Sequence, residues 1–233
     1  MAVPMLLSTQ VRDEKYAGLT YHIEGELVPV LQVEMQNMGI YFEHHVLLWK
    51  DPAVNISARA MKGTFKRMVA GMPIFMTEAA GPGRIAFSRD GPGHVFALHL
   101  QAGQAVDVRE HQFLAASSNI DYSFRRVQGA ANMFLSGSGL FIDTFSTQHQ
   151  EGVLWLQGYG NVFELELGAG EQIDIEPGAW IYKDPGVNME TKIQKLSAGF
   201  FAGAGQVVWN RFTGPGRIGL QSWSMLMGME SGA

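Results

Sequence analysis

The feature that most constrains this chain is a pattern of β-strand segments that recurs three times. Each occurrence opens with a segment of alternating apolar residues, and these segments span 30–35, 96–100 and 162–167. A polar turn, mostly with glycine, and a second alternating segment follow each time, the second segments being 40–42, 106–108 and 173–175. Period-two alternation is typical of a strand with one buried face, and two strands around a short Gly turn are typical of a hairpin or tight corner.

Later anchors recur in the same order. A Lys-Asp-Pro turn occurs in segments 49–55 and 182–188, 133 positions apart, and Gly-Pro-Gly-Arg-Ile occurs at 81–85 and again at 214–218. An apolar segment with an internal glycine recurs at steps of 66, spanning 68–72, 134–138 and 200–204. The middle copy keeps only turn character at 116–121 and 150–153. General β alternation does not explain these identities, so the sequence predicts three diverged copies of one unit of about 66 residues.

This pattern predicts the fold class. A single unit of this kind cannot bury its own apolar face, so neighbouring units must share a core. We expect an all-β protein in which three sequential β-sandwich or double-stranded β-helix-like repeats surround a pseudo-threefold axis, with short helical or loop insertions. A short amphipathic helix or ordered loop is expected over residues 58–69. The expected parts of this one compact domain are an N-terminal extension with one strand, three repeats and a flexible tail, over residues 1–26, 27–92, 93–159, 160–227 and 228–233.

Composition excludes several classes of protein. Hydrophobic residues make up 46% of the chain and charged residues 17%, which suits a compact core. The absence of cysteine excludes disulfides, thiolate zinc sites and cysteine nucleophiles. A net charge of −5 argues against general nucleic-acid binding. No apolar run reaches the roughly 20 residues of a membrane helix, and the first nine residues lack the features of a signal peptide, so we expect a cytoplasmic protein.

Catalytic motifs are sparse. The segment 170–178 resembles half of a cupin signature, but none of the seven histidines forms the His-x-His pair of a cupin metal site. The adjacent His44 and His45 would point to opposite faces of a strand. The chain has neither a Gly-x-Ser-x-Gly elbow nor a phosphate-binding loop. We therefore expect no catalytic residue, cofactor or metal ligand. We also expect the recurring carboxylates to lie on solvated faces: Glu43, Asp107, Glu110, Asp174 and Glu176.

Basic residues fall in equivalent regions of the three copies. Around a threefold axis they would form a basic ring able to hold an anion or RNA, whereas the alternative is ordinary solubilising charge. The candidate anion- or RNA-binding residues are Lys62, Lys66, Arg67, Arg125, Arg126, Lys192 and Lys195.

The third copy carries a family resemblance. Segments 162–192, 200–205 and 211–217 resemble the AIM24 family, a domain of unknown function. The first copy is less similar, because residues 43–46 replace an acidic-Pro-Gly or acidic-Gly turn that the family usually has. The family is similar in fold to the tryptophan RNA-binding attenuation protein, so the resemblance implies three units per chain and a ring-like homo-oligomer. It implies no established activity. Eukaryotic members are linked to mitochondria, but this N-terminus lacks an Arg-rich, Ser-rich presequence, so we expect a bacterial cytoplasmic member.

Three functions remain open at this point. We favour an uncharacterised, non-enzymatic, oligomeric β scaffold or binding protein, most simply a homotrimer, whose 13 Met and 14 Phe residues suit both a core and apolar subunit contacts. The first alternative is an RNA- or anion-binding protein. The second is a cupin-like, metal-dependent enzyme. The identity of any small-molecule ligand is not specified by these patterns.

Overall fold

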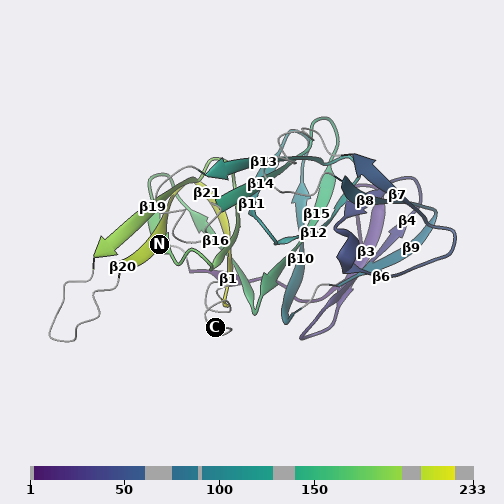
Figure 1. Ribbon diagram of the computed structural model, residues 1–233, viewed down its shortest axis with the longest axis horizontal. Helices are drawn as coiled ribbons and strands as arrows, with labels where there is room; N and C mark the ends of the chain where they lie inside the picture. The colour runs from purple at the N-terminus through teal and green to yellow at the C-terminus, as the bar shows by residue number, and fades with distance from the viewer. Residues whose placement is uncertain (1–2, 61–74, 89–90, 128–139, 196–205, 224–233) are drawn as a thin grey trace.

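The computed structural model describes residues 3–60, 75–88, 91–127, 140–195 and 206–223. In these ranges the chain forms β-strands, with one turn of 3-10 helix, η1 (His44–Val46), as the sole helical element there. Every strand pairing among the described residues is antiparallel (Figure 1). The predicted all-β class is confirmed.

The N-terminal extension holds more strands than the sequence predicts. It contains β1 (Met5–Leu6), β2 (Val11–Tyr16) and β3 (Leu19–Glu24), whereas alternation indicates only the strand at 19–23. Strand β2 has the sequence Val-Arg-Asp-Glu-Lys-Tyr and is the outermost strand of its sheet. Charged residues are usual on such an edge strand, and they hide its period.

The remaining described strands fall into three groups of six. The first group consists of β4 (Val30–Met35), β5 (Ile40–Phe42), β6 (Leu47–Lys50), β7 (Asn55–Ala60), β8 (Phe75–Ala80) and β9 (Gly83–Phe87). The second consists of β10 (Gly93–Leu100), β11 (Ala105–Arg109), β12 (Phe113–Ser117), β13 (Asp121–Val127), β14 (Leu140–Ser146) and β15 (Gly152–Tyr159). The third consists of β16 (Val162–Leu167), β17 (Gln172–Ile175), β18 (Trp180–Lys183), β19 (Asn188–Lys195), β20 (Gln206–Thr213) and β21 (Gly216–Gln221).

The same pairing scheme applies in all three groups. The sixth strand pairs with the first and the third strands, as in β10–β15–β12. The fifth strand pairs with the second and the fourth strands, as in β11–β14–β13. Each group therefore contributes three strands to each of two different sheets.

Neighbouring groups are joined by one strand pair each. Strand β5 of the first group pairs with β12 of the second, and β11 of the second group pairs with β18 of the third. These pairs create the six-stranded sheet β10-β15-β12-β5-β8-β7 and the seven-stranded sheet β1-β16-β21-β18-β11-β14-β13. The other two sheets, β2-β3-β4-β9-β6 and β17-β20-β19, end in β6 and β17 respectively within the described chain.

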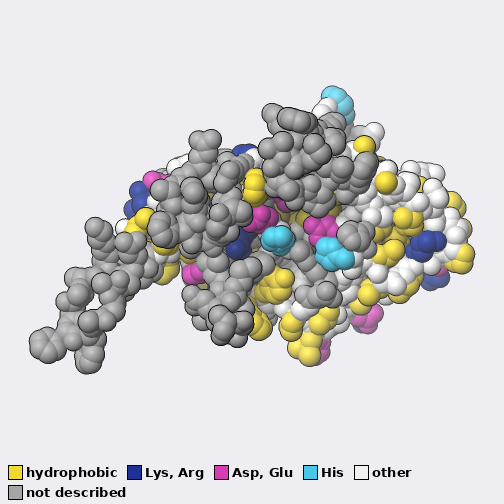
Figure 2. Space-filling view, in the orientation of Figure 1, with side chains coloured by type: hydrophobic (Ala, Val, Ile, Leu, Met, Phe, Trp, Pro, Cys, Tyr) yellow, Lys and Arg dark blue, Asp and Glu magenta, His cyan; other side chains and the backbone are white. Residues whose placement is uncertain are grey.

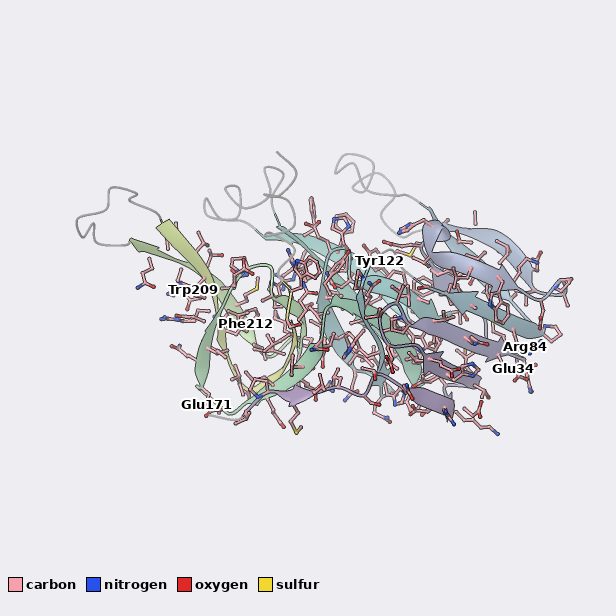
Figure 3. The ribbon with its side chains drawn as sticks, turned by 90° about the horizontal axis from the view of Figure 1, so that it is seen from below. Glu34, Arg84, Tyr122, Glu171, Trp209 and Phe212 are labelled. Atoms are coloured by element: carbon pink, nitrogen blue, oxygen red, sulfur yellow. The ribbon has the colours of Figure 1, made fainter. Side chains whose placement is uncertain are left out.

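The three groups lie in a row along the long axis of the molecule. Figure 1 shows β4, β6 and β9 at one end, β10 and β15 in the middle, and β19 and β20 at the other end. Figure 3 gives the same order, with Glu34 and Arg84 at one end, Tyr122 between, and Trp209 and Phe212 toward the other. The second strands of the first two groups, β5 and β11, each join the next group, whereas β17 of the third pairs only with β20 in the described chain. The expected arrangement about a pseudo-threefold axis is not shown by this row.

The core follows the groups. Three clusters of buried apolar side chains extend along the row, and each of them includes residues of more than one group. Trp155 and Trp180 are fully buried within these clusters. Tyr21 of the extension packs edge-on against Trp155 at a ring-centroid distance of 5.3 Å, which fixes the extension to the first core cluster.

Two further expectations concern segments between strands and at the end of the chain. Residues 58–60 complete β7, so the helix expected over 58–69 does not begin there, and residues 61–69 lie outside the described ranges. The expected tail at 228–233 also lies outside them. Within the described chain, no helix is long and apolar enough to cross a membrane.

Candidate functional site

The junction between the second and third groups is built on a buried charge pair. Asp107 on β11 lies opposite Lys183 on β18, and Lys183 Nζ is 2.9 Å from Asp107 Oδ2. Their side chains are only 7% and 3% exposed. Arg125 donates to the same carboxylate oxygen at 2.9 Å, and the Thr144 hydroxyl donates to the other oxygen at 2.8 Å. The carboxylate therefore receives three donors in a site with little water.

These donors determine the charge state of Asp107. Burial would raise the pKa of its carboxyl, but hydrogen bonds from Lys183, Arg125 and Thr144 outweigh that effect and bring the pKa below its ordinary value. The prediction that this carboxylate lies on a solvated face is wrong. Alternation with valine suggested an outward-facing residue, whereas the adjacent group covers that face and supplies a lysine.

The junction between the first and second groups has the same backbone arrangement and different chemistry. Tyr41 on β5 lies opposite Ala116 on β12, and Phe42 lies opposite Ala115. All four side chains are fully buried. The guanidinium of Arg59 lies 4.3 Å from the centroid of the Tyr41 ring and donates to the Ser118 carbonyl at 3.0 Å. An aromatic ring with a stacked cation thus takes the place of the carboxylate.

Strand register shows which residues correspond between groups. The second strand pairs with the fifth through Tyr41–Glu78, Asp107–Thr144 and Asp174–Arg211. The third strand pairs with the sixth, and in every group the register shifts after the first pair. The first position after the shift is Trp49, Ala115 or Tyr182, and the next position is Lys50, Ala116 or Lys183. Asp174 is therefore the counterpart of Asp107, and Lys50 is the counterpart of Lys183.

Strands β6 and β17, each at one edge of its sheet, carry the counterparts Lys50 and Asp174. On β6, Leu48 is 54% exposed and Trp49 is 41% exposed, whereas the residues at the same positions of β12 and β18 are fully buried: Leu114, Ala115, Ile181 and Tyr182. On β17, Asp174 is partly exposed and receives two hydrogen bonds of 2.7 Å from Arg211. The pKa of Asp174 lies below its ordinary value because of the Arg211 hydrogen bonds.

Comparison with known proteins places the chain in a family. The family model described as Mitochondrial biogenesis AIM24 matches residues 21–223. The chain belongs to the AIM24 family. The resemblance seen in the sequence is thus confirmed, and the match extends over all three groups of strands.

One solved structure shows the same fold as this AIM24 chain. It is the X-ray crystal structure of protein SPYM3_0169 from Streptococcus pyogenes, which is 21% identical, with a TM-score of 0.68. The alignment covers 91% of this chain and 97% of that one. No curated protein matches the AIM24 chain. The similarity to the tryptophan RNA-binding attenuation protein is not among these findings and stays a prediction.

The predicted basic site falls on separate parts of this AIM24 chain. Arg125 lies at the charged junction, and Lys192 Nζ on β19 is 2.7 Å from Glu190 Oε2. The backbones of Arg126 and Lys195 belong to β13 and β19, which are in different sheets. Lys62, Lys66 and Arg67 lie outside the described residues. On the part of the surface described in Figure 2, the Lys and Arg side chains are spread out rather than gathered in one patch.

Lys183 and Arg59 are members of the junctions that the sequence pattern did not identify. Arg59 and Arg125 stand 66 positions apart, which is the step that the sequence pattern predicts, and both lie on the fourth strand of their groups. That spacing was a usable signal for Arg59. Lys183 belongs to the recurring Lys-Asp-Pro turn, but that turn did not indicate its partner, because Asp107 is far away in the sequence and belongs to another group.

The cupin-like alternative requires a cluster of metal-binding side chains. No group of three or more His, Asp or Glu residues there could hold a metal ion. His99 is bonded to the Tyr21 hydroxyl at 2.8 Å and stacks on Tyr16 at 4.0 Å between ring centroids, so its contacts are those of a packed side chain. The cupin-like alternative therefore has no ligand cluster to build on in these ranges and stays untested.

Proposed function

We propose that this chain is a non-enzymatic structural scaffold, built from three copies of one six-stranded unit, that assembles with further copies of itself. The units correspond to the three groups of strands. Their common pairing scheme, in which the six strands of each unit pair with one another in the same order, supports the repeat.

Compensating side-chain sizes also support the repeat. At the pair between the third and sixth strands, one residue is a large aromatic and the other is small in every group: Trp49 with Ala86, Trp155 with Ala115, and Tyr182 with Gly219. In the second group the aromatic comes from the opposite strand. Total volume is therefore kept at this position while the residues differ, as expected when copies of one unit diverge around a close-packed core.

The exposure of β6 is the observation that carries the proposal of self-assembly. Leu48 and Trp49 face solvent in an isolated chain, although their counterparts in the other two units are fully buried by the neighbouring unit. A free strand edge with apolar side chains invites pairing with another chain, and proteins ordinarily cover or disrupt such edges. An additional unit, supplied by another copy, would cover β6 in the way that units inside the chain cover β12 and β18.

Light scattering after size-exclusion chromatography tests the proposal. We expect a mass that is a multiple of 25.6 kDa at micromolar concentration. Trp49→Ser should shift the protein toward the monomer because it removes apolar area from β6, whereas Trp223→Ser, at another exposed tryptophan, should leave the mass unchanged. A 25.6 kDa species at every concentration would refute self-assembly.

The RNA- or anion-binding alternative gains nothing from the two basic side chains that can be assessed. Both Arg125 and Lys192 are paired with carboxylates of the same chain. A filter-binding assay against RNA at several salt concentrations would test it, because phosphate contacts weaken steeply with added salt. Undetectable binding at low salt would remove the alternative.

A further inference from the structure

Both junctions inside the chain use one rule. The second strand of one unit pairs with the third strand of the next, and the register is the same each time. Tyr41 lies opposite Ala116 and its counterpart Asp107 lies opposite Lys183, while Phe42 and Val108 lie opposite Ala115 and Tyr182. Applied once more, this rule would pair β17, the second strand of the third unit, with a β6 strand.

We propose that β17 of one copy pairs with β6 of a second copy in this register, so that Asp174 lies opposite Lys50 and Ile175 lies opposite Trp49. This inference rests on the proposed self-assembly and specifies its interface. The occupant of each free edge is another copy of the same chain, because the edges continue a pairing that the chain already makes twice and because their charges are complementary.

The lysine side of the contact is already arranged as in the internal junction. Lys50 Nζ lies 3.4 Å from the Asp51 carbonyl oxygen, and Lys183 Nζ lies 3.4 Å from the Asp184 carbonyl oxygen. The aspartate that follows each lysine accepts a 2.9 Å hydrogen bond from a backbone amide, that of Arg84 in the first unit and that of Arg217 in the third. Lys50 therefore has the same local contacts as Lys183, whose ammonium group reaches the Asp107 carboxylate.

The aspartate side matches as well. Asp107 and Asp174 both bond to the residue opposite them on the fifth strand, Thr144 and Arg211 respectively. The side chain of Asp174 is 37% exposed, whereas that of Asp107 is 7% exposed beneath Lys183. The added exposure is on a strand whose other edge has no partner in the described chain, which leaves Asp174 accessible to an incoming ammonium group.

The symmetry of this contact differs from that of an ordinary dimer. Each copy presents two different edges, so the interface is heterologous and can continue from copy to copy as a closed ring or an open filament. The two edges of one chain cannot meet, because the first and third groups occupy opposite ends of the row (Figure 1). Two copies related by a twofold axis would instead bring identical edges together.

Disulfide trapping tests the register directly, since the chain has no cysteine of its own. Directly opposed residues of antiparallel strands have Cα atoms about 4.5–5.5 Å apart, which suits a disulfide. Under diamide, the double variant Lys50→Cys/Asp174→Cys should give a ladder of covalent dimers, trimers and larger species, or one closed oligomer. Each single variant should give no specific cross-link. The control Lys15→Cys/Asp174→Cys, which places the first cysteine on the exposed strand β2 instead of on β6, should give no ladder.

Charge reversal supplies a second readout. Lys50→Asp and Asp174→Lys should each weaken association by roughly tenfold or more, and the double reversal in one chain should restore it. Thermal unfolding checks that each variant is folded.

If the wild type is oligomeric but the double-cysteine variant forms no ladder, the β17–β6 contact is wrong while self-assembly stands. If Lys50→Cys alone cross-links efficiently, the interface is twofold and the contact is again wrong. A monomeric wild type would overturn both proposals.

Discussion

The two junctions inside the chain have the same backbone pairing and opposite side-chain chemistry. Between the first and second units, alanines on β12 meet the ring of Tyr41 and the side chain of Phe42. Between the second and third units, Lys183 on β18 meets Asp107. Strand pairing and side-chain volume are therefore common to both junctions, and either apolar packing or an ion pair can occupy the same position.

The two solutions differ in how they respond to change. A buried ion pair is weak evidence of added stability, because the desolvation of two charges offsets their attraction. Removal of one partner, however, leaves an uncompensated buried charge. The first junction has no charged residue in its strand pair, and the ion pair beside it, Arg59 with Glu78, is partly exposed. It is called the neutral junction below. We therefore expect the charged junction to be the more sensitive of the two to substitution and to pH.

The largest effect is expected from Lys183→Ala. This change leaves the Asp107 carboxylate buried with Arg125 and Thr144 but without its least exposed cation, so it should lower the free energy of unfolding by about 3–5 kcal/mol. Chemical denaturation measures it, with Lys15→Ala on the exposed edge strand β2 as the control, expected to change stability by less than about 0.5 kcal/mol. A loss below about 1 kcal/mol for Lys183→Ala would show that the pair is not coupled to folding.

A smaller, pH-dependent effect is expected from Asp107→Asn. At neutral pH the variant should lose about 1–3 kcal/mol, because Lys183 and Arg125 lose their anionic acceptor. The folded-state pKa of Asp107 is lowered relative to the unfolded chain, so its contribution is fully present above the unfolded value, near 4, and is lost as pH falls through the folded value. The stability gap between wild type and variant should therefore narrow as the pH falls below about 4.

Denaturation of both proteins at a series of pH values from neutral to acid measures this gap. The exposed Asp13→Asn serves as a matched control, because it removes a carboxylate whose side chain is 84% exposed. Its stability curve should follow that of the wild type. A gap that stays constant across the acid range would mean that Asp107 does not contribute to folding through its charge.

The sequence predicts the strands of each unit far better than the contacts between units. Alternation marks strands such as β4 and β16 because one face is buried within the unit. The junctions depend on faces that a neighbouring unit covers, and Asp107 between two valines has the local pattern of a solvated residue. The row arrangement was likewise not predictable, since no local signal states whether successive units close a circle. The AIM24 resemblance was recognisable in the third unit, where the glycine turns are most regular.

The smallest effect is expected at the neutral junction, from Tyr41→Phe. The Tyr41 hydroxyl is buried and has no hydrogen-bond partner among the described residues. Removing the hydroxyl removes the free-energy cost of burying an unbonded polar group and breaks no hydrogen bond, while the ring stays in place beneath Arg59. We expect the free energy of unfolding to stay the same or to rise by up to about 1 kcal/mol.

Tyr122→Phe is the matched comparison for that substitution. Tyr122 is also buried, but its hydroxyl donates to Asp143 at 2.6 Å, so its removal should destabilise the protein by about 1–3 kcal/mol. The two variants delete the same atom from rings in comparable surroundings, and chemical denaturation of both separates loss of a bond from loss of a hydroxyl. If Tyr41→Phe were as destabilising as Tyr122→Phe, the first junction would contain a polar contact at its centre, and the contrast between a neutral and a charged junction would fail.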